Sequence, residues 1–270
     1  MWNLATGTCD IALTGHKSWV VSIVKLADGR IVSGSRNGVL RVWNTATGVC
    51  QHVLKGHSEC IDSLVTLGDG RVVSGSRDHT LRVWNVASGA CERTLTGHTR
   101  AVREVVDLGE GRVVSLSEDS TLRVWNTATT EHELAASDDH QARVTSLLAL
   151  DDSTVVSGSE DCTLFVWNAV TGQCERVLKG HTGTVLNLVD LGDRRVVSGS
   201  KDCTLRVWDV STGTCQHTLT GHLGEIELMV TLGRGLVVSV SRDEPRVYYN
   251  TDSTVYVWDT TTGQRLQTLK

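Results

Sequence analysis

The chain repeats itself about every 41 residues. A tripeptide of Val, Trp and Asn or Asp recurs once in each repeat, with the tryptophans at Trp43, Trp84, Trp125, Trp167, Trp208 and Trp258. A histidine stands early in each repeat, at His16, His57, His98, His140, His181 and His222. A unit of this length cannot bury its own apolar faces, so it must stack against its neighbours. The sequence therefore predicts a repeat architecture.

The composition is typical of short strands joined by tight turns. The chain has 26 Gly, one Pro and one Phe, and its 40% hydrophobic residues can fill a sizeable core. No apolar run approaches the roughly 18 residues that span a bilayer, and Met1-Trp2-Asn3 enters a repeat directly, with no signal peptide ahead of it. We expect one compact, monomeric domain over residues 1–270 in a cytoplasmic or nuclear protein. The net charge of -5 makes nucleic acid or anionic lipid a less favoured partner.

The eight cysteines are copies of repeat positions. Five follow a turn at the same point of a repeat (Cys9, Cys50, Cys91, Cys174 and Cys215), and Cys162 and Cys203 share a second point. Equivalent positions in successive units should lie beyond the roughly 7 Å Cα separation that a disulfide allows, and no C-x-x-C spacing suggests zinc. We therefore predict reduced structural thiols.

One repeat, residues 56–96, illustrates the expected strands. Cys60–Leu67 is apolar on both faces, as in a strand between two neighbouring sheets. After a Gly-Asp-Gly turn, Arg71–Ser76 predicts a second strand, with small residues where another sheet approaches closely. Thr80–Trp84 and Cys91–Leu95 predict the third and the outer strand.

A period near 40 with Gly-His early and Trp-Asp late resembles the WD40 family of β-propellers, over nearly the whole chain. The resemblance implies an all-β propeller of six complete four-stranded blades plus an N-terminal extra outer strand. The expected blades are residues 15–55, 56–96, 97–138, 139–179, 180–220 and 221–270, with residues 1–14 as a partial blade or closure strand.

The two ends of the chain leave the closure of the ring open. Residues 1–14 repeat the end of a third strand and a whole outer strand of a unit whose other strands are absent. Two outer strands, Cys9–Leu13 and Leu266–Leu269, therefore compete for one place. We favour a six-bladed ring, with a piece of a longer seven-bladed protein as the alternative.

The resemblance also implies a hydrogen-bonded chain of Trp, Ser, His and Asp in each blade. Indole only donates, hydroxyl and imidazole donate and accept, and a carboxylate accepts, so the four groups can satisfy one another. The expected sets are His57, Ser74, Asp78 and Trp84; His98, Ser115, Asp119 and Trp125; His140, Ser157, Asp161 and Trp167; and His181, Ser198, Asp202 and Trp208. The first blade departs from this pattern, with Asn37 beside His16, Ser33 and Trp43.

A Ser-His-Asp set also suggests a hydrolase. A catalytic triad occurs once and exposes its nucleophile, whereas this set recurs in blade after blade. We therefore expect no enzyme, no cofactor and no metal. A propeller enzyme or a small-ligand binder that uses the channel is the remote alternative.

Differences between the blades carry the candidate partner site. Trp19 is the only tryptophan outside the repeated tripeptide, and the resemblance places it on the top face as an apolar anchor, although it could also fold over its own blade. The residues before the turn Asp or its equivalent are Arg36, Arg77, Glu118, Glu160, Lys201 and Arg242. Other top-face candidates are Val21, Arg103 and Arg143.

The sixth repeat carries an insertion after Asp243 that contains the only Pro and the pair Tyr248-Tyr249. Such a loop is suited to partner contact, but a harmless surface insertion would look the same. The insertion also leaves the acidic member of that blade open between Asp243 and Asp252.

The segment Arg71–Trp84, echoed at Arg195–Trp208, looks closest to propellers of the F-box/WD type. Those proteins present substrates to ubiquitin ligases and bind phosphorylated segments through top-face arginines. No F-box is visible in these 270 residues, so that role requires a further region or a partner. We predict a non-enzymatic protein-interaction scaffold that binds acidic or phosphorylated segments across blades six, one and two, with a generic assembly scaffold as the alternative.

Overall fold

The computed structural model describes residues 2–3, 7–129, 132–137, 140, 142–242 and 253–269. The chain divides into two compact units, residues 1–137 and residues 138–270. In the described ranges every regular element is a β-strand. Those ranges contain no helix long and apolar enough to cross a membrane.

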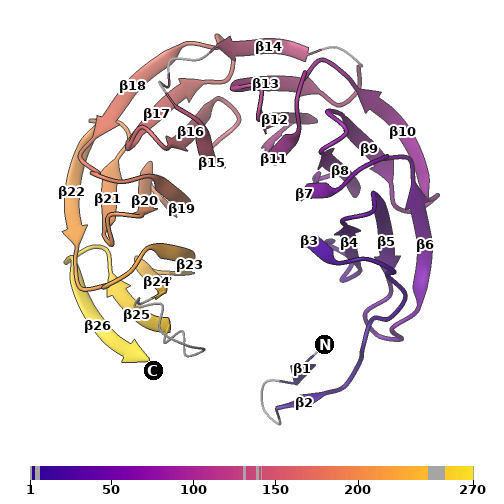
Figure 1. Ribbon diagram of the computed structural model, residues 1–270, viewed down its shortest axis with the longest axis horizontal. Coiled ribbons are helices and arrows are strands. Elements are labelled where there is room, and N and C mark those ends of the chain that lie inside the picture. Colours follow the sequence, from indigo (N-terminus) through magenta and orange to yellow (C-terminus); the bar gives the residue numbers. More distant parts are fainter. Residues whose placement is uncertain are drawn as a thin grey trace. The chain divides into compact units, whose positions relative to one another are not determined.

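The first unit holds a short hairpin and three four-stranded antiparallel sheets (Figure 1). The hairpin is β1 (Trp2–Asn3) and β2 (Thr8–Cys9). The sheets are β3 (Val20–Lys25), β4 (Ile31–Ser35), β5 (Val39–Trp43) and β6 (Cys50–Lys55); β7 (Ile61–Thr66), β8 (Arg71–Ser76), β9 (Leu81–Asn85) and β10 (Ala90–Leu95); and β11 (Val102–Gly109), β12 (Arg112–Ser117), β13 (Thr121–Asn126) and β14 (His132–Ser137). The first strands β3, β7 and β11 are neighbours.

The second unit holds three more sheets of the same topology. They are β15 (Val144–Ala149), β16 (Thr154–Ser159), β17 (Thr163–Asn168) and β18 (Cys174–Lys179); β19 (Val185–Gly192), β20 (Arg195–Ser200), β21 (Leu205–Asp209) and β22 (Thr214–Leu219); and β23 (Ile226–Gly233), β24 (Leu236–Arg242), β25 (Ser253–Asp259) and β26 (Gln264–Leu269). Six sheets, each with its strands in chain order, confirm the predicted all-β propeller fold. Blades one to six are the sheets that begin at β3, β7, β11, β15, β19 and β23.

The terminal strands differ from the expectation. The predicted N-terminal extra strand is present but shorter than expected, because β2 covers Thr8–Cys9 instead of Cys9–Leu13. It pairs with β1, and Trp2 lies opposite Cys9 as Trp43 lies opposite Cys50. Within the second unit, β26 pairs with β25, so the C-terminal strand holds the outer place of the last sheet.

Glycines on the second strands allow adjacent sheets to pack closely. A Cβ at Gly34 would lie 2.8 Å from Ile61 Cγ2, and a Cβ at Gly75 would lie 2.8 Å from Val102 Cγ1. Ile61 and Val102 are buried in two successive apolar cores, one between blades one and two and one between blades two and three. The small residues of the sequence pattern thus set the spacing of the sheets.

The first sheet of the first unit, β3–β6, exposes two apolar side chains whose counterparts in blade two are buried. Val20 and Ile23 occupy the register positions of Ile61 and Leu64 but are 52% and 60% exposed. Within the described part of this unit only the β1–β2 hairpin precedes β3, and no four-stranded sheet there covers the two side chains.

Candidate functional site

The four polar residues of blade two form one hydrogen-bonded chain. Trp84 Nε1 donates to Ser74 Oγ at 2.8 Å, and Ser74 Oγ lies 2.7 Å from His57 Nε2. His57 Nδ1 lies 2.7 Å from Asp78 Oδ2. A neutral imidazole with its proton on Nδ1 donates to the carboxylate and accepts from the serine, so every group in the chain has a partner.

The same contacts recur in three other blades. The distances for Trp to Ser, Ser to His and His to Asp are 2.8, 2.7 and 2.8 Å for Trp125, Ser115, His98 and Asp119; 2.7, 2.8 and 3.0 Å for Trp167, Ser157, His140 and Asp161; and 2.8, 2.7 and 2.8 Å for Trp208, Ser198, His181 and Asp202. All four serines are fully buried. A buried hydroxyl that is already hydrogen-bonded on two sides is not positioned as a nucleophile.

The environment fixes the charges of these groups. Burial by itself would raise the pKa of Asp119, but hydrogen bonds from Thr121, the Thr99 amide and His98 outweigh it and hold the pKa at about 2. Burial lowers the pKa of His98 by more than Asp119 raises it. Near neutral pH the pair therefore consists of an ionised carboxylate and a neutral imidazole.

The first and last blades depart from this network. In blade one, His16 Nε2 and Trp43 Nε1 both contact Ser33 Oγ at 2.7 Å. Asn37 is not part of that chain, because its Oδ1 accepts from Ser35 Oγ at 2.7 Å.

In blade six, His222 contacts Ser239 and Ser241 through its two ring nitrogens, both at 2.6 Å, and Trp258 donates to Ser239 at 2.8 Å. Both candidates for the acidic member, Asp243 and Asp252, lie outside the described residues, as do Tyr248 and Tyr249.

Sequence reasoning missed an arginine that precedes the blade tryptophan by two residues. The guanidinium carbon of Arg41 lies 5.8 Å from the Trp43 ring centroid. Equivalent arginines donate to the outer-strand thiols, at 3.3 Å for Arg41 and Cys50, 3.6 Å for Arg82 and Cys91, and 3.7 Å for Arg206 and Cys215. The repeated sequence Leu-Arg-Val-Trp was the available signal.

The structure also shows the state of the cysteines and the placement of side chains that could bind a metal ion. All eight cysteines lie in the described ranges and none is in a disulfide. Burial raises the pKa of the Cys60 thiol to about 11. Among the described residues, no group of three His, Cys, Asp or Glu side chains is placed to hold a metal ion.

In each blade, a backbone hydrogen bond joins the two variable positions that the family resemblance places on the top face. The amide of the residue before the turn donates to the carbonyl of the residue at the start of the first strand. The pairs are Arg36 and Trp19, Arg77 and Cys60, Glu118 and Ala101, Glu160 and Arg143, and Lys201 and Thr184, all at 2.9 Å, and Arg242 and Glu225 at 3.4 Å. Side chains at these two positions therefore lie next to each other in every blade.

In blade one this pair is Trp19 and Arg36. Trp19 is 76% exposed, and the Arg36 guanidinium carbon lies 5.6 Å from its ring centroid. In the described part of the chain, no carboxylate lies within ion-pair distance of Arg36. Val21, two residues further along the chain, is also exposed.

Most of the other predicted basic residues are paired with acids. Asp62 contacts Arg77 at 3.0 Å and Arg103 at 2.6 Å, and Arg103 also pairs with Glu118. In the second unit, Lys201 lies 3.7 Å from Glu225 and Arg242 lies 3.0 Å from Glu227. Arg143 is exposed at the start of β15. These ion pairs offset much of the positive charge that the sequence predicts for this face.

Comparison with known proteins agrees with this architecture. The family model described as WD domain, G-beta repeat, matches residues 7–44, 48–85, 89–126, 132–168 and 172–209. No curated protein matches the chain. A crystal structure of the computationally designed Ika8 protein is similar, with 34% sequence identity, a TM-score of 0.85, and coverage of 99% of this chain and 79% of the designed one.

Proposed function

The chain belongs to the WD40 repeat family, and we propose that it is a non-enzymatic protein-interaction scaffold that binds acidic or phosphorylated segments through Trp19 and Arg36 of blade one. The observation that carries the proposal is the cation–π contact of Arg36 with an indole that is 76% exposed. Exposed Trp and Arg are the residue types most often found at the energetic centre of protein interfaces.

The chemistry of the pair favours an anionic ligand with an apolar neighbour. A guanidinium that contacts an aromatic face still has N–H groups available in a fork that can bind a carboxylate or phosphate through two hydrogen bonds. The indole then supplies apolar contact area beside the anion. Because Arg36 has no acid partner among the described residues, a ligand does not have to displace an existing ion pair.

The site formed by Trp19 and Arg36 is smaller than the site across blades six, one and two that the sequence predicts. Arg77 and Arg242 are engaged by Asp62 and Glu227, so a ligand gains less from them than from Arg36. We keep Arg77 as a secondary contact, because its side chain is still 43% exposed.

The test is binding of phosphorylated and unphosphorylated peptide libraries to the wild type, Trp19→Ala and Arg36→Glu. Loss of the Trp19 indole should weaken binding at least tenfold, and Arg36→Glu should abolish selection of acidic peptides. Thr184→Ala/Lys201→Glu changes the same two register positions in blade five and serves as the matched control. Unchanged affinity and salt dependence in Arg36→Glu would overturn the proposal.

A more specific form of the proposal is a substrate receptor of a ubiquitin ligase. Its support is the sequence similarity of Arg71–Trp84 to F-box/WD propellers. Affinity capture with the chain as bait, followed by mass spectrometry, should recover ligase subunits together with phosphorylated substrates. Recovery of partners without any ligase subunit would favour the generic assembly scaffold.

A further inference from the structure

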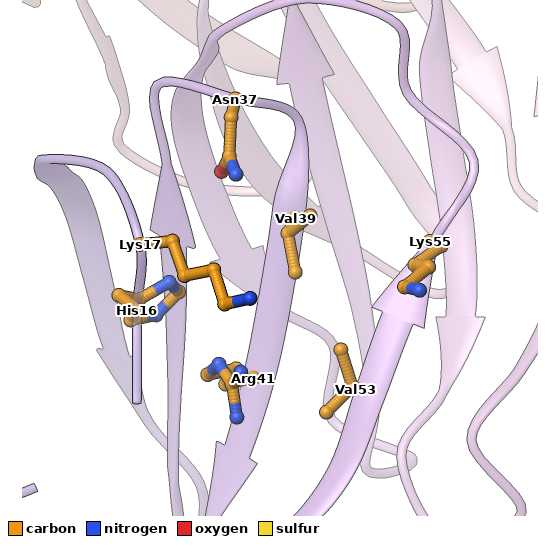
Figure 2. A pocket seen from close by; sticks show the side chains of 7 residues that line it. All are labelled: His16, Lys17, Asn37, Val39, Arg41, Val53 and Lys55. Carbon is orange, nitrogen blue, oxygen red and sulfur yellow. The ribbon is translucent and has the colours of Figure 1, made fainter. Parts of the chain in front are cut away.

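Blade one contains a pocket of about 480 Å³ that the candidate site does not include (Figure 2). Four of its lining residues are basic: His16, Lys17, Arg41 and Lys55. Figure 2 shows the Lys17 side chain crossing the pocket, with its ammonium group between Arg41 and Val39. No carboxylate is among the lining residues, so the pocket carries positive charge.

The corresponding place in blade two is occupied by a carboxylate. There Asp78 Oδ2 accepts from His57 Nδ1 at 2.7 Å and from the Ser58 amide at 3.1 Å. In blade one the residue at this position is Asn37, whose side-chain oxygen is hydrogen-bonded to Ser35. His16 hydrogen-bonds through Nε2, and among the described residues no acceptor contacts its Nδ1.

Two further differences distinguish blade one, and one of them makes its pocket more positive. Val39 replaces the threonine (Thr80 in blade two) that bonds to the aspartate. Lys17 replaces Ser58. The change from Asp to Asn removes one negative charge and the change from Ser to Lys adds one positive charge, and blade one combines both.

We propose that this pocket binds a phosphate monoester, with its oxyanion in the place that the Asp78 carboxylate holds in blade two. His16 Nδ1 and the backbone amide of Lys17 are the donors equivalent to those that Asp78 uses. The Lys17 ammonium and the Arg41 guanidinium supply the additional charge that a dianion requires. Val39 and Val53 form an apolar wall suited to a short carbon stem next to the phosphate.

The protonation of His16 gives a direct reporter. Burial and then the nearby Arg41 charge lower the pKa of His16, so the ring is neutral near pH 7. An anion beside Nδ1 favours the charged form and raises that pKa. Phosphate binding should therefore shift the His16 imidazole resonances and move their titration midpoint to higher pH.

The experiment follows the His16 resonances by NMR and measures affinity by calorimetry, with inorganic phosphate, phenyl phosphate and a phosphothreonine peptide. We expect all three to bind, and phenyl phosphate to bind more tightly than inorganic phosphate. Asn37→Asp places the carboxylate of the other blades in the site, so it should weaken binding at least tenfold while raising the Tm. Lys17→Ser should weaken binding with little change in Tm.

Lys179→Thr is the control for the loss of a lysine outside this pocket, because it removes the lysine that blade four carries at the Lys55 position. It should bind phosphate as the wild type does. Trp19→Ala should also leave binding in this pocket intact, which separates failure of this inference from failure of the proposed function. Absence of a His16 shift in the wild type, or an equal shift in Asn37→Asp, would overturn the phosphate site. Equal affinity for phenyl phosphate and inorganic phosphate would overturn the role of the valine wall.

Discussion

The Arg36 guanidinium carbon lies over the Trp19 indole, 5.6 Å from its ring centroid, and the Arg36 amide donates to the Trp19 carbonyl at 2.9 Å. The same backbone bond joins Arg77 to Cys60 in blade two, where the buried Cys60 presents no comparable surface. The repeat therefore fixes where the two side chains lie, and their identity decides what the surface can bind. Trp19 contributes to the surface, whereas the blade tryptophans contribute to the core.

This difference predicts very different effects of two substitutions on stability. Trp167 is 5% exposed and donates to Ser157, so Trp167→Ala should lower the free energy of unfolding by about 3–5 kcal/mol. Trp19→Ala should change it by no more than about 0.5 kcal/mol, because the indole is mostly in solvent. Urea midpoints of the two variants and the wild type provide the measurement. Equal shifts would contradict the structural role of the networks.

The histidines and aspartates predict a two-step loss of stability in acid. The pKa values of His98 and His181 are lower in the folded chain than the ordinary value near 6.5, so the unfolded chain binds protons first as the pH falls. Stability should therefore be greatest above pH 6.5 and decline below it. The pKa values of Asp119 and Asp202 are lowered to about 2, which adds a second loss from about pH 4 downward.

Urea midpoints between pH 8 and pH 3 test this profile. Asp119→Asn serves as the control, because it removes one of the carboxylates and should reduce the second step. A constant midpoint from pH 8 to pH 5 would show that the buried histidines do not titrate as the structure implies.

The sequence was sufficient for the repeated features. Strand order and the Trp-Ser-His-Asp chains follow from a pattern that recurs in several blades, and a recurring pattern reports local backbone geometry and burial. The prediction for β8, Arg71–Ser76, coincides with the strand in the structure. The N-terminal extra strand was predicted too long, as Cys9–Leu13 instead of Thr8–Cys9, because the extent of a strand depends on a partner that the local sequence does not specify.

Features specific to one blade could not be predicted from the sequence. The ion pairs of Asp62 join residues of blades two and three, and their geometry depends on how adjacent sheets pack. The hydrogen bond of Asn37 to Ser35 instead of to His16 is a rotamer choice that residue type alone does not determine. For the same reason, the sequence did not show that acidic side chains would pair with Arg77, Lys201 and Arg242 and offset their positive charge.

The glycines between the sheets predict a second contrast. A Cβ at Gly75 would lie 2.8 Å from Val102 Cγ1 and 2.8 Å from Val105 Cγ2, so Gly75→Ala should destabilise the chain by about 1–3 kcal/mol through overpacking. Gly68 has nothing within 4 Å of the same point, and Gly68→Ala should be close to neutral. Chemical denaturation curves of the two variants and the wild type measure the change in the free energy of unfolding. A neutral effect at Gly75 would mean that the sheets can move apart without loss of core contacts.

Pairing at the two ends predicts which terminus the fold depends on. A chain that ends at Gly263 lacks β26, so β25 keeps β24 but loses its outer ladder partner and exposes unpaired N–H and C=O groups. A chain that begins at Asp10 loses β1 and β2, which pair only with each other in the described residues. We expect the C-terminal truncation to cost about 2 kcal/mol or more, to lower the Tm by about 4–8 °C and to promote self-association, while the N-terminal truncation has little effect. Thermal melts with light scattering distinguish the two, and the reverse order would show that residues 1–9 stabilise the propeller more than β26 does.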